Sequence, residues 1–298
     1  MSVLARAATT PRFEPALMRR RLSGTIFYGA CLAAIGITLL AIVILLYDIF
    51  TRGLTHLDLN FLTGVPSRIP ARAGVAPAFV GSLQLGILLA VIAFPLGVGA
   101  AVYLEEYTRA SRLNRLLRTN IANLAGVPSI VYGIFGLALF VRALGLGYTL
   151  FAAALTLALL ILPVVIISTM EAIRAVPASQ REAAYALGAT RWQVVRGAVL
   201  PAAAPGIMTG IILAMARAIG ETAPLILIGA VTFVTYLPQP FDGGYTVLPI
   251  QVYSWAARFQ PAFQEISATA IIVLLALLVL LNVLAIVVRV RLSRHLQW

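Results

Sequence analysis

The chain has 298 residues, of which 61% are hydrophobic and only 11% are charged. Soluble domains carry about 25% charged residues, so this composition excludes a water-soluble fold and predicts an all-α, polytopic membrane protein. The net charge of +12 does not indicate nucleic-acid binding, because all 22 basic residues are Arg and lie mainly in short segments between apolar runs.

Six apolar stretches, each long enough to cross ~30 Å of hydrocarbon, predict six transmembrane helices. The predicted spans are 25–47, 80–103, 121–141, 149–170, 204–230 and 267–288. The first stretch is too long for the core of a signal peptide, so we expect an uncleaved first helix. We therefore expect an N-terminal tail over 1–24 and a membrane domain over 25–298.

The distribution of Arg predicts the orientation of the chain. Sixteen Arg lie in the two tails and in segments 104–118 and 174–196, whereas five lie in 48–77, 142–148 and 231–264. This excess places both termini in the cytoplasm and the chain in the cytoplasmic (inner) membrane. The outer segment 48–77 reads as an irregular loop. The outer segment 231–264 is rich in turn residues and aromatics, typical of an interfacial belt or of a docking surface for an outer partner.

The third predicted span contains the run GVPSIVYGIFG. Pro128 leaves one backbone carbonyl without its helical partner, and the hydroxyls of Ser129 and Tyr132 follow within a turn. Both residues are therefore candidates for lining a polar pathway through the membrane. The alternative is close packing between helices, which the glycines of this run favour.

The inner loop between the fourth and fifth spans has the composition of two short helices. Ser179, followed three residues later by Glu182, predicts a capped helix start. Gly188 permits a left-handed cap at the end of that helix. A second short helix is expected over 190–199, with Pro201 ending it.

This loop, about 174–201, resembles the coupling-helix region of ABC importer permeases, whose motif reads Glu-Ala-Ala, then Gly, then Leu-Pro. The matching residues are Glu182, Ala183, Ala184, Gly188, Leu200 and Pro201. The resemblance implies docking on a separate ATPase, with the two alanines leaving a low surface that enters a groove. Nearby arginines are expected to engage acidic rims of that partner: Arg174, Arg181, Arg191 and Arg196. An ordinary interfacial loop helix is the alternative.

The predicted fifth span contains the charged run ARAIGETAP. In a helix that enters the membrane near Ala204, Arg217 lies about 20 Å inside, past the midplane, where an Arg must face protein or a water-filled path. Glu221 shares its helix face, and Gly220 and Pro224 loosen the helix. We expect Arg217 to bind a passing oxyanion and Glu221 to hold or release it; a purely structural pair is the alternative.

Together, the second-span run ending in YLEEY, the run GVPSIVYG, the inner loop and ARAIGETAP resemble the A-type permeases of phosphate ABC importers, the PstA family, over roughly 78–290. The resemblance implies a type I ABC importer permease fold and the role of transmembrane subunit in an ATP-driven phosphate importer. It also implies three kinds of partner: a C-type sister permease in a heterodimer, a dimer of cytoplasmic ATP-binding subunits, and an extracytoplasmic phosphate-binding protein.

Other functions remain open at this point or are disfavoured. The chain has no Lys and so no nucleotide-binding P-loop, and we expect no catalytic residue, cofactor or metal site. A permease for sulfate or molybdate stays open, because Arg217 alone does not separate tetrahedral anions. An intramembrane enzyme is disfavoured because His56 and His295 fall outside the predicted spans. A stand-alone channel would transport without ATP, which the coupling loop disfavours.

Overall fold

The computed structural model describes residues 17–109, 111–230 and 233–294. These ranges consist of helices joined by turns and contain no strand. The chain divides into two units, Met1–Asp48 and Ile49–Trp298. The first long helix, α1 (Leu17–Gly53), begins in the first unit, ends in the second and contains the predicted first span. Its long apolar sequence is typical of a membrane helix.

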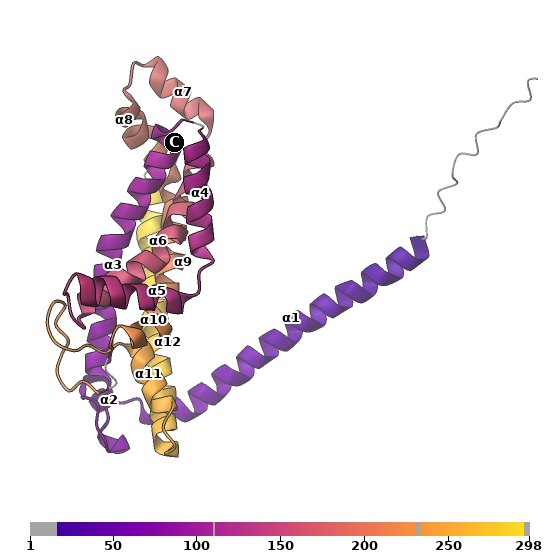
Figure 1. Ribbon diagram of the computed structural model, residues 1–298. Helices are drawn as coiled ribbons and strands as arrows, with labels where there is room; N and C mark the ends of the chain where they lie inside the picture. Colours follow the sequence, from indigo (N-terminus) through magenta and orange to yellow (C-terminus); the bar gives the residue numbers. More distant parts are fainter. Residues whose placement is uncertain (1–16, 110, 231–232, 295–298) are drawn as a thin grey trace, which may run out of the picture. The chain divides into compact units, whose positions relative to one another are not determined.

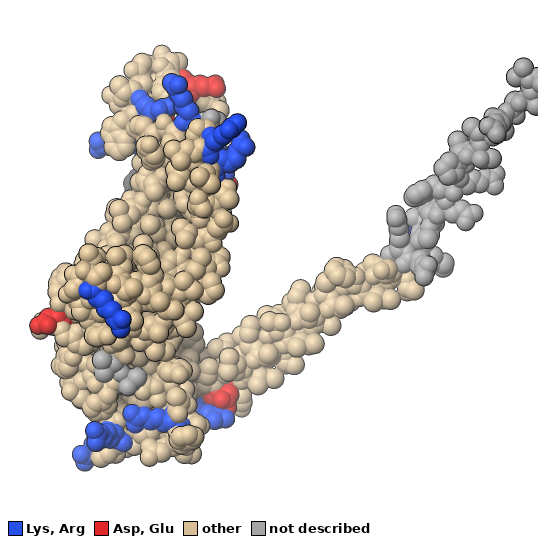
Figure 2. Space-filling view, in the orientation of Figure 1, with Lys and Arg blue, Asp and Glu red and all other residues tan. Residues whose placement is uncertain are grey.

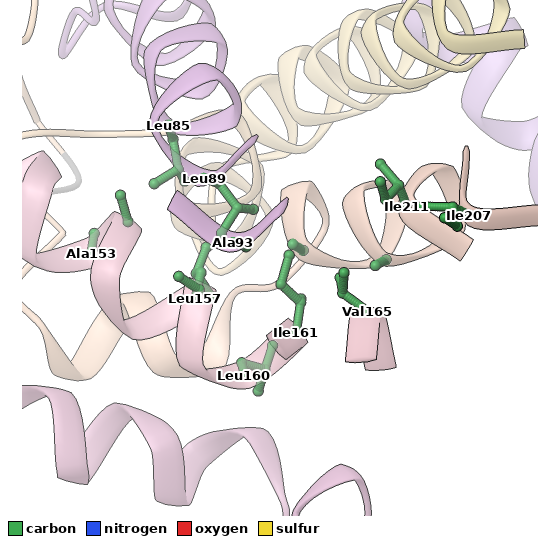
Figure 3. Packing of buried hydrophobic residues seen from close by; sticks show 14 of the residues in the cluster. Leu85, Leu89, Ala93, Ala153, Leu157, Leu160, Ile161, Val165, Ile207 and Ile211 are labelled. Carbon is green, nitrogen blue, oxygen red and sulfur yellow. The ribbon is translucent and has the colours of Figure 1, made fainter. Parts of the chain in front are cut away.

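Three long helices form the centre of the second unit. These are α3 (Ala76–Val102), α6 (Leu150–Arg174) and α9 (Leu200–Ile219). Aliphatic side chains from all three form one buried cluster, and α6 is the most buried of the spans. Figure 3 shows Leu89 and Ala93 of α3 beside Leu157 of α6. Burial of such side chains sets the relative positions of the three helices.

The last long helix, α12 (Pro261–Arg294), packs on α9 and on α11 (Leu248–Ala256). The Thr269 hydroxyl donates a 2.9 Å hydrogen bond to the Gly53 carbonyl, which ties α12 to the end of α1. The helix α11 lies inside 231–264, which we predicted only as a turn-rich loop. Short helices also order the predicted irregular loop 48–77: η1 (Leu54–His56), α2 (Leu59–Thr63) and η2 (Pro70–Arg72).

The third predicted span, 121–141, is not one continuous helix in the structure. It divides into α4 (Arg112–Ala125), α5 (Ser129–Gly136) and the π-helical turn η4 (Leu137–Ala143). The α4 and α5 stretches meet at a bend of 100°. Pro128 explains the break, because its ring excludes the helical conformation of the residue before it and removes one backbone donor. The described residues thus contain five spans, or six if the bent pair is counted as one.

The fifth predicted span, 204–230, begins earlier and ends earlier than expected. A continuous helical stretch runs from Arg191 to Ile219. It consists of α8 (Arg191–Val194), the π-helical turn η5 (Val195–Val199) and α9. The stretch ends at Gly220, which confirms the predicted loosening there, and the short α10 (Ala223–Leu227) follows. Pro201 does not end a helix; it lies inside this continuous stretch, two residues after the π-helical turn η5.

Candidate functional site

The predicted inner loop forms an elbow of two helices, residues 178–194, at one end of the second unit (Figure 1). Its first helix is α7 (Ala178–Ala186), and its second is α8. Gly188 joins them with φ of +77°. The N–H of Ala189 donates to the Ala184 carbonyl at 3.2 Å and the N–H of Gly188 to the Tyr185 carbonyl at 2.9 Å. This is the Schellman pattern, so the predicted left-handed cap at Gly188 is confirmed.

The start of each elbow helix differs from expectation. The predicted N-cap Ser179 is wrong, because α7 begins at Ala178 and Pro177 occupies the cap without a side-chain hydrogen bond. The capping box belongs to α8: the Thr190 hydroxyl accepts from the Gln193 N–H, and the Gln193 side chain accepts from the Thr190 N–H at 2.7 Å. These bonds pair helix-start donors that would otherwise lack partners and so fix the direction in which α8 leaves the elbow.

The elbow exposes several side chains that have no partner within it. Glu182 and Ala183 are exposed, and no partner for the Glu182 carboxylate appears in the described part of the chain, whereas Ala184 is half-buried against the core. Leu187 is 89% exposed beside Gly188. Two aromatic side chains, missed by sequence reasoning, are exposed as well: Tyr185 and Trp192. Large apolar residues in a loop that is otherwise polar are the sequence signal that could have indicated this exposed surface.

Most arginines around the elbow bind within the chain and do not point toward a partner, contrary to our expectation. Figure 2 shows basic side chains gathered at this end of the second unit. Three of the four that we expected to reach a partner bind the turn after α3, the π-helical η3 (Tyr103–Tyr107). The contacts are Arg174 Nε to Glu105 at 2.9 Å, Arg181 to Glu106 at 3.0 Å, and Arg191 to the Tyr107 carbonyl at 3.5 Å. Arg196 alone of the four is exposed without a partner in the described residues.

Arg217 occupies the last turn of α9, where a positive side chain complements the helix dipole. Because the helical stretch starts at Arg191, Arg217 lies about 39 Å along it, close to its far end. Its Nε is 3.5 Å from Glu221 Oε1, a loose ion pair. The Arg217 side chain is 53% exposed and that of Glu221 only 17%. The terminal nitrogens of Arg217 have no acceptor among the described residues, so its fork is free to bind an oxyanion.

The structure brings the two predicted pathway segments together. The helix α5 packs on α10, which directly follows the Arg217–Glu221 pair. The approach is close enough to need glycine, since a Cβ at Gly133 would lie 2.7 Å from the Pro224 Cα. The GVPSIVYG run and the GETAP run therefore form one contiguous surface, although they are about 90 residues apart in sequence.

Within α5, the two predicted pathway hydroxyls differ. The Tyr132 hydroxyl donates to the Leu124 carbonyl at 2.8 Å, an acceptor that Pro128, four residues later and without an N–H, does not bond. This bond braces the bend between α4 and α5 and favours a structural role for Tyr132. Ser129 is the first residue of α5 and is half-buried. No hydrogen bond from its side chain occurs within the described ranges, so its hydroxyl is available to a ligand.

The sequence is similar to membrane components of binding-protein-dependent importers. Residues 93–297 match the family described as "Binding-protein-dependent transport system inner membrane component". The phosphate transport system permease protein PstA of Mycobacterium leprae is 38% identical over 260 residues, covering 85% of this chain and 84% of the relative. The probable ABC transporter permease protein YqgI of Bacillus subtilis is 38% identical over 206 residues, 69% of each chain.

Solved structures share the fold. A bacterial alginate ABC transporter in complex with its periplasmic protein contains a chain that superposes with a TM-score of 0.67 at 14% identity, covering 93% of this chain and 98% of that one. A chain of the inward-facing MetNI methionine ABC transporter gives 0.54 at 22% identity, covering 76% and 95%. At these identities the likeness concerns the fold alone, and the predicted type I importer permease fold is confirmed.

Proposed function

Because this chain belongs to the family of binding-protein-dependent transport system inner membrane components, within its PstA group, we propose that it is the permease subunit of an ATP-driven importer of inorganic phosphate. The observation that carries the proposal is the similarity to PstA permeases over more than four-fifths of the chain. Members of this family work with a separate ATPase and a substrate-binding protein, so the chain is a transport subunit and not itself an enzyme.

The elbow is the proposed docking site for the ATPase. Glu182 and Leu187 project from it without internal partners, and exposed apolar side chains become favourable contacts only when a second protein covers them. The left-handed turn at Gly188 fixes the angle between α7 and α8. Closure of the ATPase would therefore displace the elbow as a unit, and Ala184, packed on the core, would pass that displacement to the bundle.

Arg217 is the proposed oxyanion contact. Its guanidinium is half-exposed at the end of α9, and the loose pair with Glu221 leaves its fork open. A planar fork binds two oxygens of a tetrahedral anion at once. Glu221 keeps the site weak, and weak binding suits a transporter that must release its substrate. Ser129 lies on the adjoining α5 surface and adds a neutral hydroxyl.

The partners and the orientation complete the proposal. A C-type sister permease would complete the pathway, and an extracytoplasmic phosphate-binding protein would deliver the substrate. The excess of Arg in the segments around the elbow and in both tails supports placing the elbow and the termini in the cytoplasm. Phosphate is preferred over other oxyanions because the similar permeases bear that name.

The test is uptake in cells that lack their own phosphate transporter and that express this chain with its sister permease, ATPase and binding protein. Labelled phosphate should accumulate, and excess sulfate or molybdate should not compete. Competition by sulfate or molybdate equal to that by unlabelled phosphate would reassign the substrate to another oxyanion. Absence of any oxyanion uptake by the fully assembled complex would contradict the proposal.

A further inference from the structure

Two adjacent carboxylates at the end of α3 hold different parts of the molecule. They lie in η3, the π-helical turn that ends this span, and both are largely buried. Glu105 binds Arg118 of α4 and, at 2.9 Å, Arg174 at the end of α6. Glu106 instead binds Arg181 of the elbow helix α7. Successive residues of a helix point in different directions, so one turn serves both the bundle and the elbow.

The Glu106–Arg181 contact is built with more bonds than a surface ion pair. The Arg181 Nε and a terminal nitrogen lie 3.1 and 3.0 Å from Glu106 Oε1. The two terminal nitrogens also donate to the carbonyls of Val176 and Ile173 at 2.7 and 2.8 Å. Only 9% of the Glu106 side chain and 22% of the Arg181 side chain are exposed. Every nitrogen of the guanidinium therefore has an acceptor, which fixes the side chain in one position.

The position of Arg181 connects three elements. Its backbone belongs to α7, its carbonyl acceptors lie in the last turn of α6 and two residues after it, and its carboxylate acceptor lies in η3, directly after α3. The helix α7 packs separately on α8 and η5, which lead into α9. The elbow thus packs on η5, which continues into α9, and reaches the end of α3 through a buried charge pair. Since α3 and α6 form the centre of the bundle, a movement of α7 reaches that centre directly through this pair.

We propose that Glu106 and Arg181 form a strut that transmits displacement of the elbow to α3 and α6 during transport. This inference rests on the proposed coupling function of the elbow. Glu105 has a different task in the same turn: it holds α3, α4 and α6 together irrespective of the ATPase. Glu106 is a positioning residue, because it touches neither substrate nor nucleotide and acts through Arg181.

The experiment compares Glu106→Gln with Glu171→Gln in the complete complex. Glutamine keeps the shape and one acceptor at 106 but removes the charge. Glu171 pairs with Arg174 at 2.7 Å on the exposed surface, so its neutralisation is a matched control. We expect Glu106→Gln to assemble normally and to lower the phosphate imported per ATP hydrolysed by about fivefold or more. ATP hydrolysis itself should stay within about twofold of wild type, as should both activities of Glu171→Gln.

A double-mutant cycle separates the strut from two independent effects. Arg181→Gln should lower the same ratio, and the double variant should lose no more than Arg181→Gln alone, because the pair is already broken. A double variant whose loss equals the product of the two single losses would overturn the inference. An unchanged ratio in Glu106→Gln would also overturn it, as would a parallel loss of uptake, hydrolysis and complex recovery. An inactive wild-type complex counts against the proposed function, whereas an active wild type with an unchanged Glu106→Gln counts against the strut alone.

Discussion

Substitution of Gly188 by valine tests the elbow with a defined energetic cost. The residue has φ of +77°. This conformation costs an ordinary L-residue about 1–2 kcal/mol, and it costs a β-branched residue on the order of 1–3 kcal/mol. A Cβ added at this position meets no atom within 4 Å. The substitution therefore causes no clash with the bundle, and its whole cost falls on the turn between α7 and α8.

The size of the effect on docking follows from that cost. A free elbow relieves the strain by abandoning the left-handed turn and with it the bonds from Gly188 to Tyr185 and from Ala189 to Ala184. Docking in the original shape must then restore the turn. A cost of about 2 kcal/mol weakens association with the ATPase by about 30-fold. The membrane bundle, which the turn does not support, should keep its thermal stability.

The assay measures recovery of the ATPase with the affinity-purified permease, together with phosphate uptake. Gly197→Ala is the matched control, because this η5 glycine also has open space around an added Cβ but does not have a positive φ. Alanine there should leave both readouts unchanged or slightly stabilise the helix, by about 0.5–1 kcal/mol. Wild-type ATPase recovery and uptake in Gly188→Val would refute the role assigned to the turn.

Three further predictions address the rest of the account. Arg217→Gln should abolish most uptake while the complex assembles, and Arg217→Lys should restore part of it, since lysine supplies charge without the fork; uptake near wild type in Arg217→Gln would leave only a structural charge. Gly136→Val should destabilise the bundle by about 1–3 kcal/mol in thermal unfolding, because a Cβ there would lie 2.6 Å from Thr156 Cγ2; an unchanged melting temperature would contradict the packing of α5 on α6. A reporter fused after Trp298 should be active in the cytoplasm, and an external signal would overturn the orientation.

Hydropathy was sufficient to predict most of the fold. Long apolar runs have few alternatives to a membrane helix, so α1 and α12 contain their predicted spans, and α3 and α6 contain all but one residue of theirs. The bend between α4 and α5 was not predicted. Pro128 indicates that a helix breaks there but not the angle of the break, which the packing of α5 on α10 determines. Pro201 was misread for a similar reason: proline usually ends a helix, but here the helix continues through it after the π-helical turn η5, which local sequence does not reveal.

The candidate site was predicted in part. The left-handed turn at Gly188 could be predicted, because its signal lies within a few residues of sequence. The partners of Arg174 and Arg181 come from a turn about 70 residues earlier, and no local pattern identifies them. One signal was available: Glu105 and Glu106 stand side by side in a chain with only 10 acidic residues, opposite segments rich in Arg. Scarce charges of opposite sign on one side of a membrane favour pairing with each other.

The most direct test of the account is phosphate accumulation in proteoliposomes that contain this chain, its sister permease and the ATPase, with the binding protein on the side opposite the ATPase. The account predicts accumulation that requires both ATP and the binding protein and that stops when a non-hydrolysable nucleotide replaces ATP. Phosphate flux of equal size without ATP would identify a channel and contradict the central claim that the elbow couples this permease to ATP hydrolysis.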